Sequence, residues 1–394
     1  MEVVINKSIL GTAQHLSYDG SDFFWVNKPS GAAWTLGWPN KVRDLQVIAK
    51  AIKKEIPIFP SEAHAQSWSC LRPDKSHNVP WVDIISRETY QKQLRVLLDH
   101  LWMLITGEND QYYRETFMDN RELLLQLKKP RLNLTILREI RKENDLFLSS
   151  VTPDKGGFVE KVIYDQSGSV TGRLTVRSGP NILTLKRENR RVFTSCYPGG
   201  LLMQVDISSL EPRIALMIAE KDAKEDVYSS IIDDVVSCEI TREQAKEATL
   251  CCLYGMSAKN LRERLPDGVD AYAVLEEIRS YFRINDLQEV LREDLRSQGS
   301  IQNYFGRKIT SEPGTVVNHF LQSTGVDVSL QCFHDLLLHL DSTIYPVFVI
   351  HDALVLDVPA DKISKLSDIL SRGLRCRGFE QRFPVNITNF CGVN

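Results

Sequence analysis

Two apolar, strand-like runs each carry an aspartate, and a long helical segment separates them in the sequence. The first run, LLMQVDIS at 201–208, carries Asp206, and the second, YPVFVIHDALVLDVP at 345–359, carries Asp352 where two strands meet. The segment from 222 to about 297 has apolar residues at helical spacing almost throughout. Strands on both sides of a helical block indicate one sheet interrupted by an insertion. The sequence therefore predicts an α/β protein with both aspartates at one edge of a shared sheet.

The remaining segments follow the same two periodicities, with residues 1–85 the least regular. We expect strands at 21–26, 158–165 and 383–390, and helices at 42–55, 89–104, 121–127, 134–142, 211–221, 316–340 and 360–375. Two or three long helices should therefore lie between about 86 and 146.

Composition excludes several classes of protein. The 394 residues are 43% apolar and 25% charged, as in a soluble globular protein, and contain no apolar run of 18 residues. The N-terminus lacks the order of a secretory signal, so we expect a cytoplasmic protein, in a bacterial host cell or its equivalent, without a membrane partner. Eight cysteines without a C-x-x-C pair indicate reduced, mostly buried thiols and no zinc site.

Basic residues gather in two places although the formal net charge is -3. The segment 121–142 holds seven basic residues against two acids, and a second cluster occupies 186–191. The first segment can be a solvated pair of amphipathic helices broken at Pro130, or a surface that follows a polyanion. Sequence alone leaves both interpretations open.

The two aspartates suit a magnesium site. Paired carboxylates hold Mg²⁺ together with a substrate's phosphates, and two such ions about 3.5–4 Å apart activate an attacking oxygen and stabilise a leaving one. Either aspartate alone could equally be a turn or cap residue. Their pairing across the helical block favours the metal site.

The helix between them has an ordered stripe. Thr241 and Gln244 form a capping-box start, so the helix begins at that point. Residues four apart lie on one face, and this face carries two cations, a leucine and a tyrosine: Arg242, Lys246, Leu250 and Tyr254. The cations suit a triphosphate and the apolar pair suits a base. A solvated charged end followed by a core face explains the stripe equally well by itself.

Six segments, in order, resemble those of family A DNA polymerases, the group that includes bacterial DNA polymerase I. They are TGRL with PNI at 171–182, VDISSLEPR at 205–213, the R-x-x-x-K-x-x-x-L-x-x-x-Y-G pattern at 242–255, NYFGRK at 303–308, NHFLQSTGVD at 318–327 and VIHDALV at 349–355. The resemblance implies a right-hand polymerase fold, with an antiparallel palm sheet, helical fingers inserted in the palm and a helical thumb. It places the thumb at 86–150, the palm at 151–221 and 318–394, and the fingers at 222–317, and leaves 1–85 without a role.

By the same resemblance, Asp206, Asp352 and Lys246 are catalytic. Two Mg²⁺ ions, for which Mn²⁺ could substitute, would be held by both aspartates and by the backbone carbonyl of Ile207. The dNTP would contact Arg242, Lys246, Leu250, Tyr254 and Glu211, with Glu211 blocking a ribose 2′-OH. The primer–template would contact Arg173, His351, Gln322, Asn318, Gly255 and Arg307.

These residues predict a template-dependent DNA polymerase that extends a primer 3′-OH with dNTPs. No D-x-E occurs in residues 1–150, so we expect no 3′→5′ proofreading. Leu250, Ala353 and Tyr228 depart from the family, which usually has an aromatic residue, an acid and a histidine there. They motivate an alternative, a non-catalytic nucleic-acid-binding accessory protein; a polymerase that uses rNTPs or an RNA template is another. We expect a monomer, with a processivity factor as a further partner.

Overall fold

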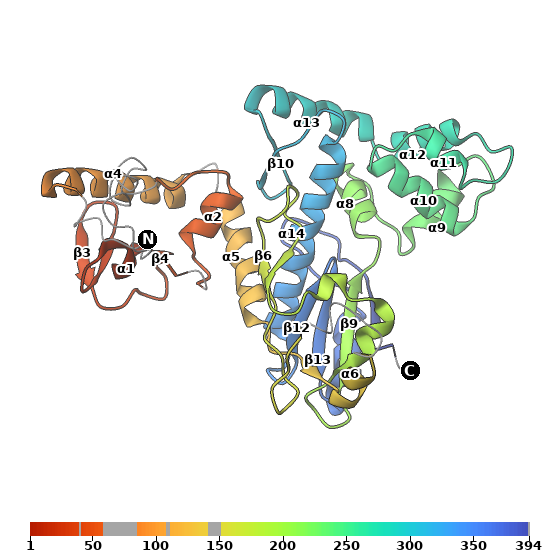
Figure 1. Ribbon diagram of the computed structural model, residues 1–394. Coiled ribbons are helices and arrows are strands. Elements are labelled where there is room, and N and C mark those ends of the chain that lie inside the picture. The colour runs from red at the N-terminus through yellow and green to blue at the C-terminus, as the bar shows by residue number, and fades with distance from the viewer. Residues whose placement is uncertain (39–40, 58–84, 108–110, 141–150, 393–394) are drawn as a thin grey trace. The chain divides into compact units, whose positions relative to one another are not determined.

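The computed structural model describes residues 1–38, 41–57, 85–107, 111–140 and 151–392. The chain forms two compact units, Met1–Arg121 and Glu122–Asn394 (Figure 1). Their boundary falls inside the segment predicted as the thumb. Within the described ranges, no helix has the length and apolar character needed to cross a membrane. One of the eight cysteines, Cys70, and two residues of the basic segment 121–142, Arg141 and Lys142, lie outside the described residues.

The N-terminal unit contains a small mixed sheet. Its strand order is β3-β2-β1-β4, with β1 at Val3–Ile5, β2 at His15–Tyr18, β3 at Phe23–Val26 and β4 at Trp34–Leu36. The helices of this unit are α1 (Lys7–Leu10), α2 (Leu45–Ala51) and α4 (Arg87–Thr106), and α5 (Gln111–Gln126) carries the boundary between the units. Tyr18 joins the sheet to α4, because its ring packs edge-on against Trp102 at 5.8 Å and its hydroxyl lies 2.9 Å from the Asp99 carboxylate.

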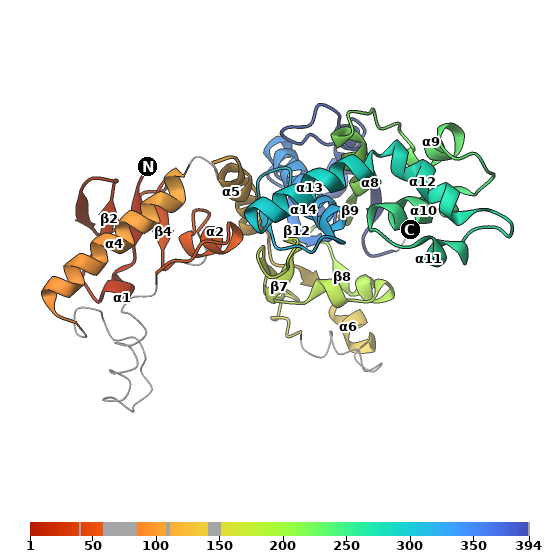
Figure 2. The ribbon, with the colours of Figure 1, turned by 90° about the horizontal axis from the view of Figure 1, so that it is seen from above.

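An antiparallel sheet organises the C-terminal unit. The strand order is β12-β13-β9-β14, with β9 at Leu201–Ile207, β12 at Tyr345–Ile350, β13 at Ala353–Val358 and β14 at Val385–Asn389. Every residue of β13 is buried, although Asp357 interrupts its otherwise apolar sequence. Helix α14 (Val316–His339), which is buried on most of its surface, lies beside the sheet in both views (Figures 1 and 2).

The chain between β9 and β12 is mostly helical, which confirms the predicted insertion into one sheet. It contains α8 (Leu210–Ile218), α9 (Val227–Asp234), α10 (Arg242–Leu253), α11 (Ala258–Arg262), α12 (Ala271–Tyr281) and α13 (Ile284–Gln298), followed by α14. Helices α9 to α12 pack on one another as a group (Figure 2).

Shorter elements complete this unit. They are α6 (Leu134–Ile140), α15 (Ile363–Leu370), the paired strands β5 (Arg131–Leu132) and β8 (Phe193–Thr194), β6 (Ile163–Asp165) and β7 (Thr175–Ser178), β10 (Ile301–Gln302) and β11 (Lys308–Ile309), and 3₁₀ helices at Ile182–Thr184, Arg187–Val192 and Ala360–Lys362. The gap between α5 and α6 confirms the predicted break at Pro130.

Three predicted elements are markedly too long. The helix expected at 42–55 is reduced to α2, and Lys53, just past its C-cap, has a left-handed φ of 54°. The strand expected at 158–165 is reduced to β6, because Phe158 and Val159 pair instead with the chain at Arg131 and Pro130. The helix expected at 360–375 ends at Leu370, since Gly373 adopts a left-handed φ of 69° and the chain then turns toward Phe383.

Candidate active site

Asp206 and Asp352 lie side by side at one edge of the C-terminal sheet. Asp206 precedes the last residue of β9, and Asp352 lies in the tight turn between β12 and β13. The register pairs Asp206 with Ala353, the residue after Asp352, and the Ile207 N–H donates to the Asp352 carbonyl at 3.3 Å. The turn is tight enough to hold His351 at a positive φ of 54°. The predicted juxtaposition of the aspartates is therefore confirmed.

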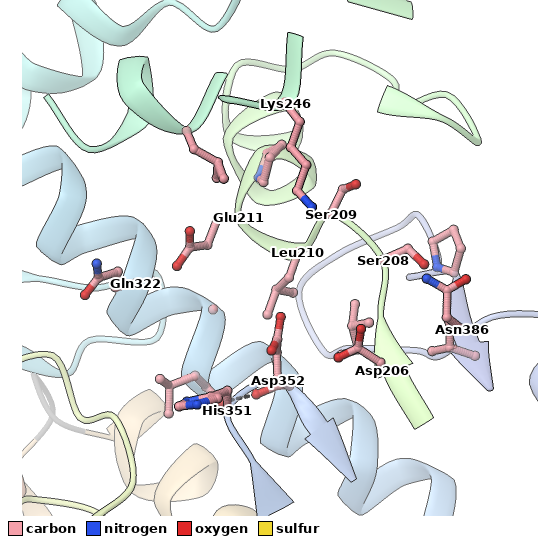
Figure 3. A pocket seen from close by; sticks show the side chains of 18 of the residues that line it. Asp206, Ser208, Ser209, Leu210, Glu211, Lys246, Gln322, His351, Asp352 and Asn386 are labelled. Carbon is pink, nitrogen blue, oxygen red and sulfur yellow. Dashed lines mark hydrogen bonds between the residues drawn. The ribbon is translucent and has the colours of Figure 1, made fainter. Parts of the chain in front are cut away.

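The two carboxylates open into a pocket of about 690 Å³. Figure 3 shows Asp206 and Asp352 rising from the strand ends while Lys246 descends from α10. Most of the predicted site residues line this pocket: Arg173, Asp206, Ile207, Glu211, Arg242, Lys246, Leu250, Tyr254, Gln322, His351 and Asp352. The sheet edge and the helix stripe therefore face the same space.

Three predicted residues are not among those that line it. Gly255 follows the C-cap of α10 with a left-handed φ of 70°, and Asn318 lies in the first turn of α14. Arg307 lies inside the protein, 3% exposed, where it pairs with buried Asp327 at 2.9 Å and donates to the Gln166 carbonyl at 3.0 Å. These bonds give Arg307 a structural role in place of the predicted contact with DNA.

The environment of Asp206 favours a bound cation. Burial, together with repulsion from Asp352, raises the pKa of Asp206 to about 6, against the opposing effect of Lys246. No cluster of three or more His, Cys, Asp or Glu side chains suited to a metal occurs in the described residues. Two carboxylates are nevertheless enough protein ligands for Mg²⁺, because this ion takes its other ligands from water and phosphate oxygens. The residues present therefore fit that ion.

The raised pKa gives a first testable prediction, Asp206→Asn. Because the pKa of Asp206 is higher in the folded than in the unfolded state, its protonated form stabilises the fold. This contribution is complete below about pH 4 and is lost as pH rises through about 6. We therefore expect Asp206→Asn to raise the free energy of unfolding by about 1 kcal/mol at pH 7.5, a value reduced for partial exposure, and by much less at pH 4.5. Urea titrations without divalent cations measure this. Exposed Asp361→Asn is the control, and an equal gain at both pH values contradicts the explanation.

Helix α10 is fixed where its sequence predicts. The Thr241 hydroxyl oxygen accepts from the Gln244 N–H, and the Gln244 side-chain oxygen accepts from the Thr241 N–H, so the capping box is complete. At the other end, the Tyr254 hydroxyl donates to the Glu211 carboxylate, and Arg173 lies 3.6 Å from the same carboxylate. Burial raises the pKa of Glu211, and the bond from Tyr254 opposes that shift. Glu211 is therefore held in place at the pocket wall.

Sequence reasoning missed several polar residues of the pocket, among them Asn386 and Asp226. Asn386 on β14 lies directly across from Asp206 in the register, and Asp226 caps α9. The strand at 383–390 was predicted, but nothing in the sequence indicated that it pairs with β9. Asp226 could have been recognised in the sequence as a cap residue before a helix, but the sequence does not indicate which basic residue it pairs with.

Comparison with known proteins identifies the family. The model of DNA polymerase family A matches residues 91–394. The chain belongs to DNA polymerase family A. This family A chain is 25% identical over 242 residues to DNA polymerase I of Aquifex aeolicus (strain VF5), covering 55% of the chain and 42% of that protein. It is 24% identical over 289 residues to the DNA polymerase of Bacillus phage SP01, covering 59% of the chain and 31% of that protein.

A solved structure has a similar fold. The POL domain of Pol1 from M. smegmatis, in complex with DNA primer–template and dNTP, aligns with a TM-score of 0.50 and 17% identity, covering 89% of this family A chain and 64% of that one. The shared architecture is the polymerase-domain fold of family A. The chain spans less than half the length of the two curated relatives.

Proposed function

We propose that this chain is a template-dependent DNA polymerase that extends a primer 3′-OH with dNTPs. One observation carries the proposal: two strand-end carboxylates and the cations of α10 line the same pocket. The family and its named polymerases support it. Extension of a labelled primer by the purified chain, with dNTPs or rNTPs on DNA or RNA templates, tests it. A chain that binds primer–template without extending it would be the accessory protein that Ala353 and Leu250 suggest.

We expect the parts of the right-hand fold to correspond to the following elements. The C-terminal sheet would be the palm, and the segment 222–317, which is inserted between its strands and carries α9 to α13, would form the fingers. The thumb would come from the helices within 86–150. Residues 1–85 have no assigned role.

Asp206, Asp352 and the Ile207 carbonyl would hold Mg²⁺ in this pocket. When bound, the ions would supply charge neutralisation and lower the pKa of the attacking hydroxyl. Primer–template contacts would come from Arg173, Gln322 and His351, which all line the pocket. Gln322 lies on α14, His351 lies in the β12–β13 turn, and Arg173 precedes β7.

The chain's own residues would position the nucleotide. Arg242 and Lys246 would hold its phosphates, while Leu250 and Tyr254 would border its base. The primer 3′-OH would lose its proton to water as its oxygen attacks the α-phosphorus, a new O–P bond would form, and the bond to the leaving pyrophosphate would break. Lys246 would donate a proton to that leaving oxygen. Catalysis of this kind depends mainly on positioning and electrostatic stabilisation.

Glu211 would exclude ribonucleotides. Its side chain is 15% exposed and is held by Tyr254 and Arg173, so it cannot easily move aside for a 2′-OH. We expect Glu211→Ala to raise the ratio of rNTP to dNTP incorporation by at least about tenfold, because removing the obstructing group admits the hydroxyl. Single-nucleotide incorporation with dCTP and CTP measures the ratio. Glu263→Ala, an exposed acid after α11, is the control, and an unchanged ratio in Glu211→Ala would refute this role.

We also propose that this chain carries no 3′→5′ proofreading activity. A family exonuclease needs a carboxylate motif, and residues 1–150 contain no D-x-E. Degradation of a mismatched primer terminus by the purified chain would contradict this. A processivity partner remains compatible with the proposed reaction.

A further inference from the structure

Arg242 is held on two sides within the pocket. Its Nε lies 2.7 Å from one carboxylate oxygen of Asp226 and its Nη2 lies 3.2 Å from the other. The guanidinium carbon lies 5.4 Å from the centre of the Tyr228 ring. Both contacts come from the first turn of α9, which packs against α10. Asp226 and Tyr228 together therefore make a seat for this cation.

Asp226 is itself fixed in place. Its carboxylate accepts the backbone N–H groups of Tyr228 at 3.1 Å and Ser229 at 3.4 Å, and the Ser229 hydroxyl at 2.8 Å. The bond from Arg242, above all, holds the pKa of Asp226 well below its usual range. Asp226 is thus a charged N-cap with a defined direction, not a mobile surface acid.

A buried arginine ties this cap to the sheet edge. Arg213, 2% exposed, donates to the Ser208 carbonyl at 2.9 Å, to the Lys224 carbonyl at 3.0 Å and to the Glu225 carbonyl. Ser208 follows the last residue of β9, and Glu225 precedes Asp226. The end of the strand that carries Asp206 is therefore bonded to the chain that holds Arg242.

The remaining edge of Arg242 is the one that a phosphate can use. A guanidinium offers five N–H donors, and Asp226 occupies the edge formed by Nε and Nη2. Within the part of the chain that the structure describes, the ion pair on the Nη1 and Nη2 edge is a weak one, from Nη1 to the exposed Glu243 carboxylate at 3.5 Å. A phosphate can bind that edge in the bidentate manner without displacing Asp226.

We propose that Asp226 and Tyr228 seat Arg242 so that its outer edge faces the nucleotide's phosphates, which makes Asp226 a positioning residue for triphosphate binding. This inference rests on the proposed function. It also gives a role to Tyr228, which stands where polymerases of this family usually have a histidine: the ring supports the arginine.

Asp226→Asn tests the seat with little disturbance of the fold, because asparagine caps a helix as well as aspartate does. We expect the KM for dNTP to rise about fivefold, the factor that corresponds to ~1 kcal/mol for a partly exposed ion pair, while kcat changes by less than about twofold. Asp270→Asn is the matched control. Asp270 caps α12 through the same pair of bonds, from the Tyr272 and Ala273 N–H groups, and is not among the residues that line the pocket. We expect it to leave both constants unchanged.

A double-mutant cycle separates positioning from a general structural effect. If Asp226 acts through Arg242, Asp226→Asn adds nothing to the KM of Arg242→Ala. An unchanged or lowered KM in Asp226→Asn, an equal rise in Asp270→Asn, or the same fivefold effect in the Arg242→Ala background would each overturn the seat.

Direct binding distinguishes this inference from the proposed function. Isothermal titration of dATP with Mg²⁺ into the chain bound to a dideoxy-terminated primer–template gives a Kd without turnover. If the wild-type chain binds dATP but does not extend a primer, the proposed polymerase function is refuted. The role of Asp226 in positioning Arg242 is then supported by weaker binding of dATP to Asp226→Asn. Equal Kd values in wild type and Asp226→Asn refute the seat, whatever the polymerase assay shows.

Discussion

Asp206→Ala and Asp352→Ala should each slow primer extension with Mg²⁺ by at least about 10³-fold. The two carboxylates lie at adjacent strand ends and face one pocket, so removing either leaves a single acid to hold a divalent cation. The loss of several kcal/mol of charge stabilisation in the transition state corresponds to that factor. Single-turnover extension of a labelled primer measures the rate.

Binding of primer–template should persist in both variants, because these carboxylates contribute no positive charge to a DNA contact. Fluorescence anisotropy gives the Kd, which we expect within about threefold of wild type at matched salt. Asp361→Ala, an exposed acid in the same unit, should leave the extension rate unchanged. Extension at the wild-type rate in either pocket variant would refute two-metal catalysis by this pair.

Lys246→Ala has the second largest expected effect, a fall in kcat of about 10²-fold or more, the usual contribution of a positioned proton donor. Lys246 occupies the middle of the α10 stripe and lies close enough to Asp206 to lower its pKa. Its ammonium can both attract the triphosphate and donate a proton to the pyrophosphate. Rapid-quench incorporation of one nucleotide at saturating dNTP measures the change.

Lys246→Arg separates the two roles of this side chain. Arginine retains the positive charge and cannot lose a proton at neutral pH, so the KM for dNTP should recover while kcat stays low. Exposed Lys259→Ala, on the next helix, controls for loss of a lysine. Full recovery of kcat in Lys246→Arg would mean that Lys246 contributes charge alone.

Local patterns were sufficient to predict the elements that build the pocket. The apolar runs before Asp206 and Asp352 predicted strands with acids at their ends, and the helical block between them predicted an insertion. Thr241 and Gln244 predicted the start of α10 because a capping box depends only on residues three apart.

Features that depend on long-range packing could not be predicted. Asn386 lies beside Asp206 only because β14 pairs with β9, and strand order is not a local property. The family resemblance implied a DNA contact for Arg307, whereas the structure pairs this arginine with buried Asp327, a partner 20 residues away. Asp226 was recognisable as a cap, whereas its bond to Arg242 depends on how α9 packs against α10.

Ala353 has a consequence for the order in which ligands arrive. It lies across from Asp206 where polymerases of this family usually carry an acid, so two strand-end carboxylates are left to attract a free cation. Magnesium dehydrates reluctantly and binds a site of this kind mainly through phosphate oxygens. We therefore expect the magnesium ion to enter the pocket already bound to the nucleotide. The concentration of the magnesium–nucleotide complex, not that of free magnesium, would then set the speed of synthesis.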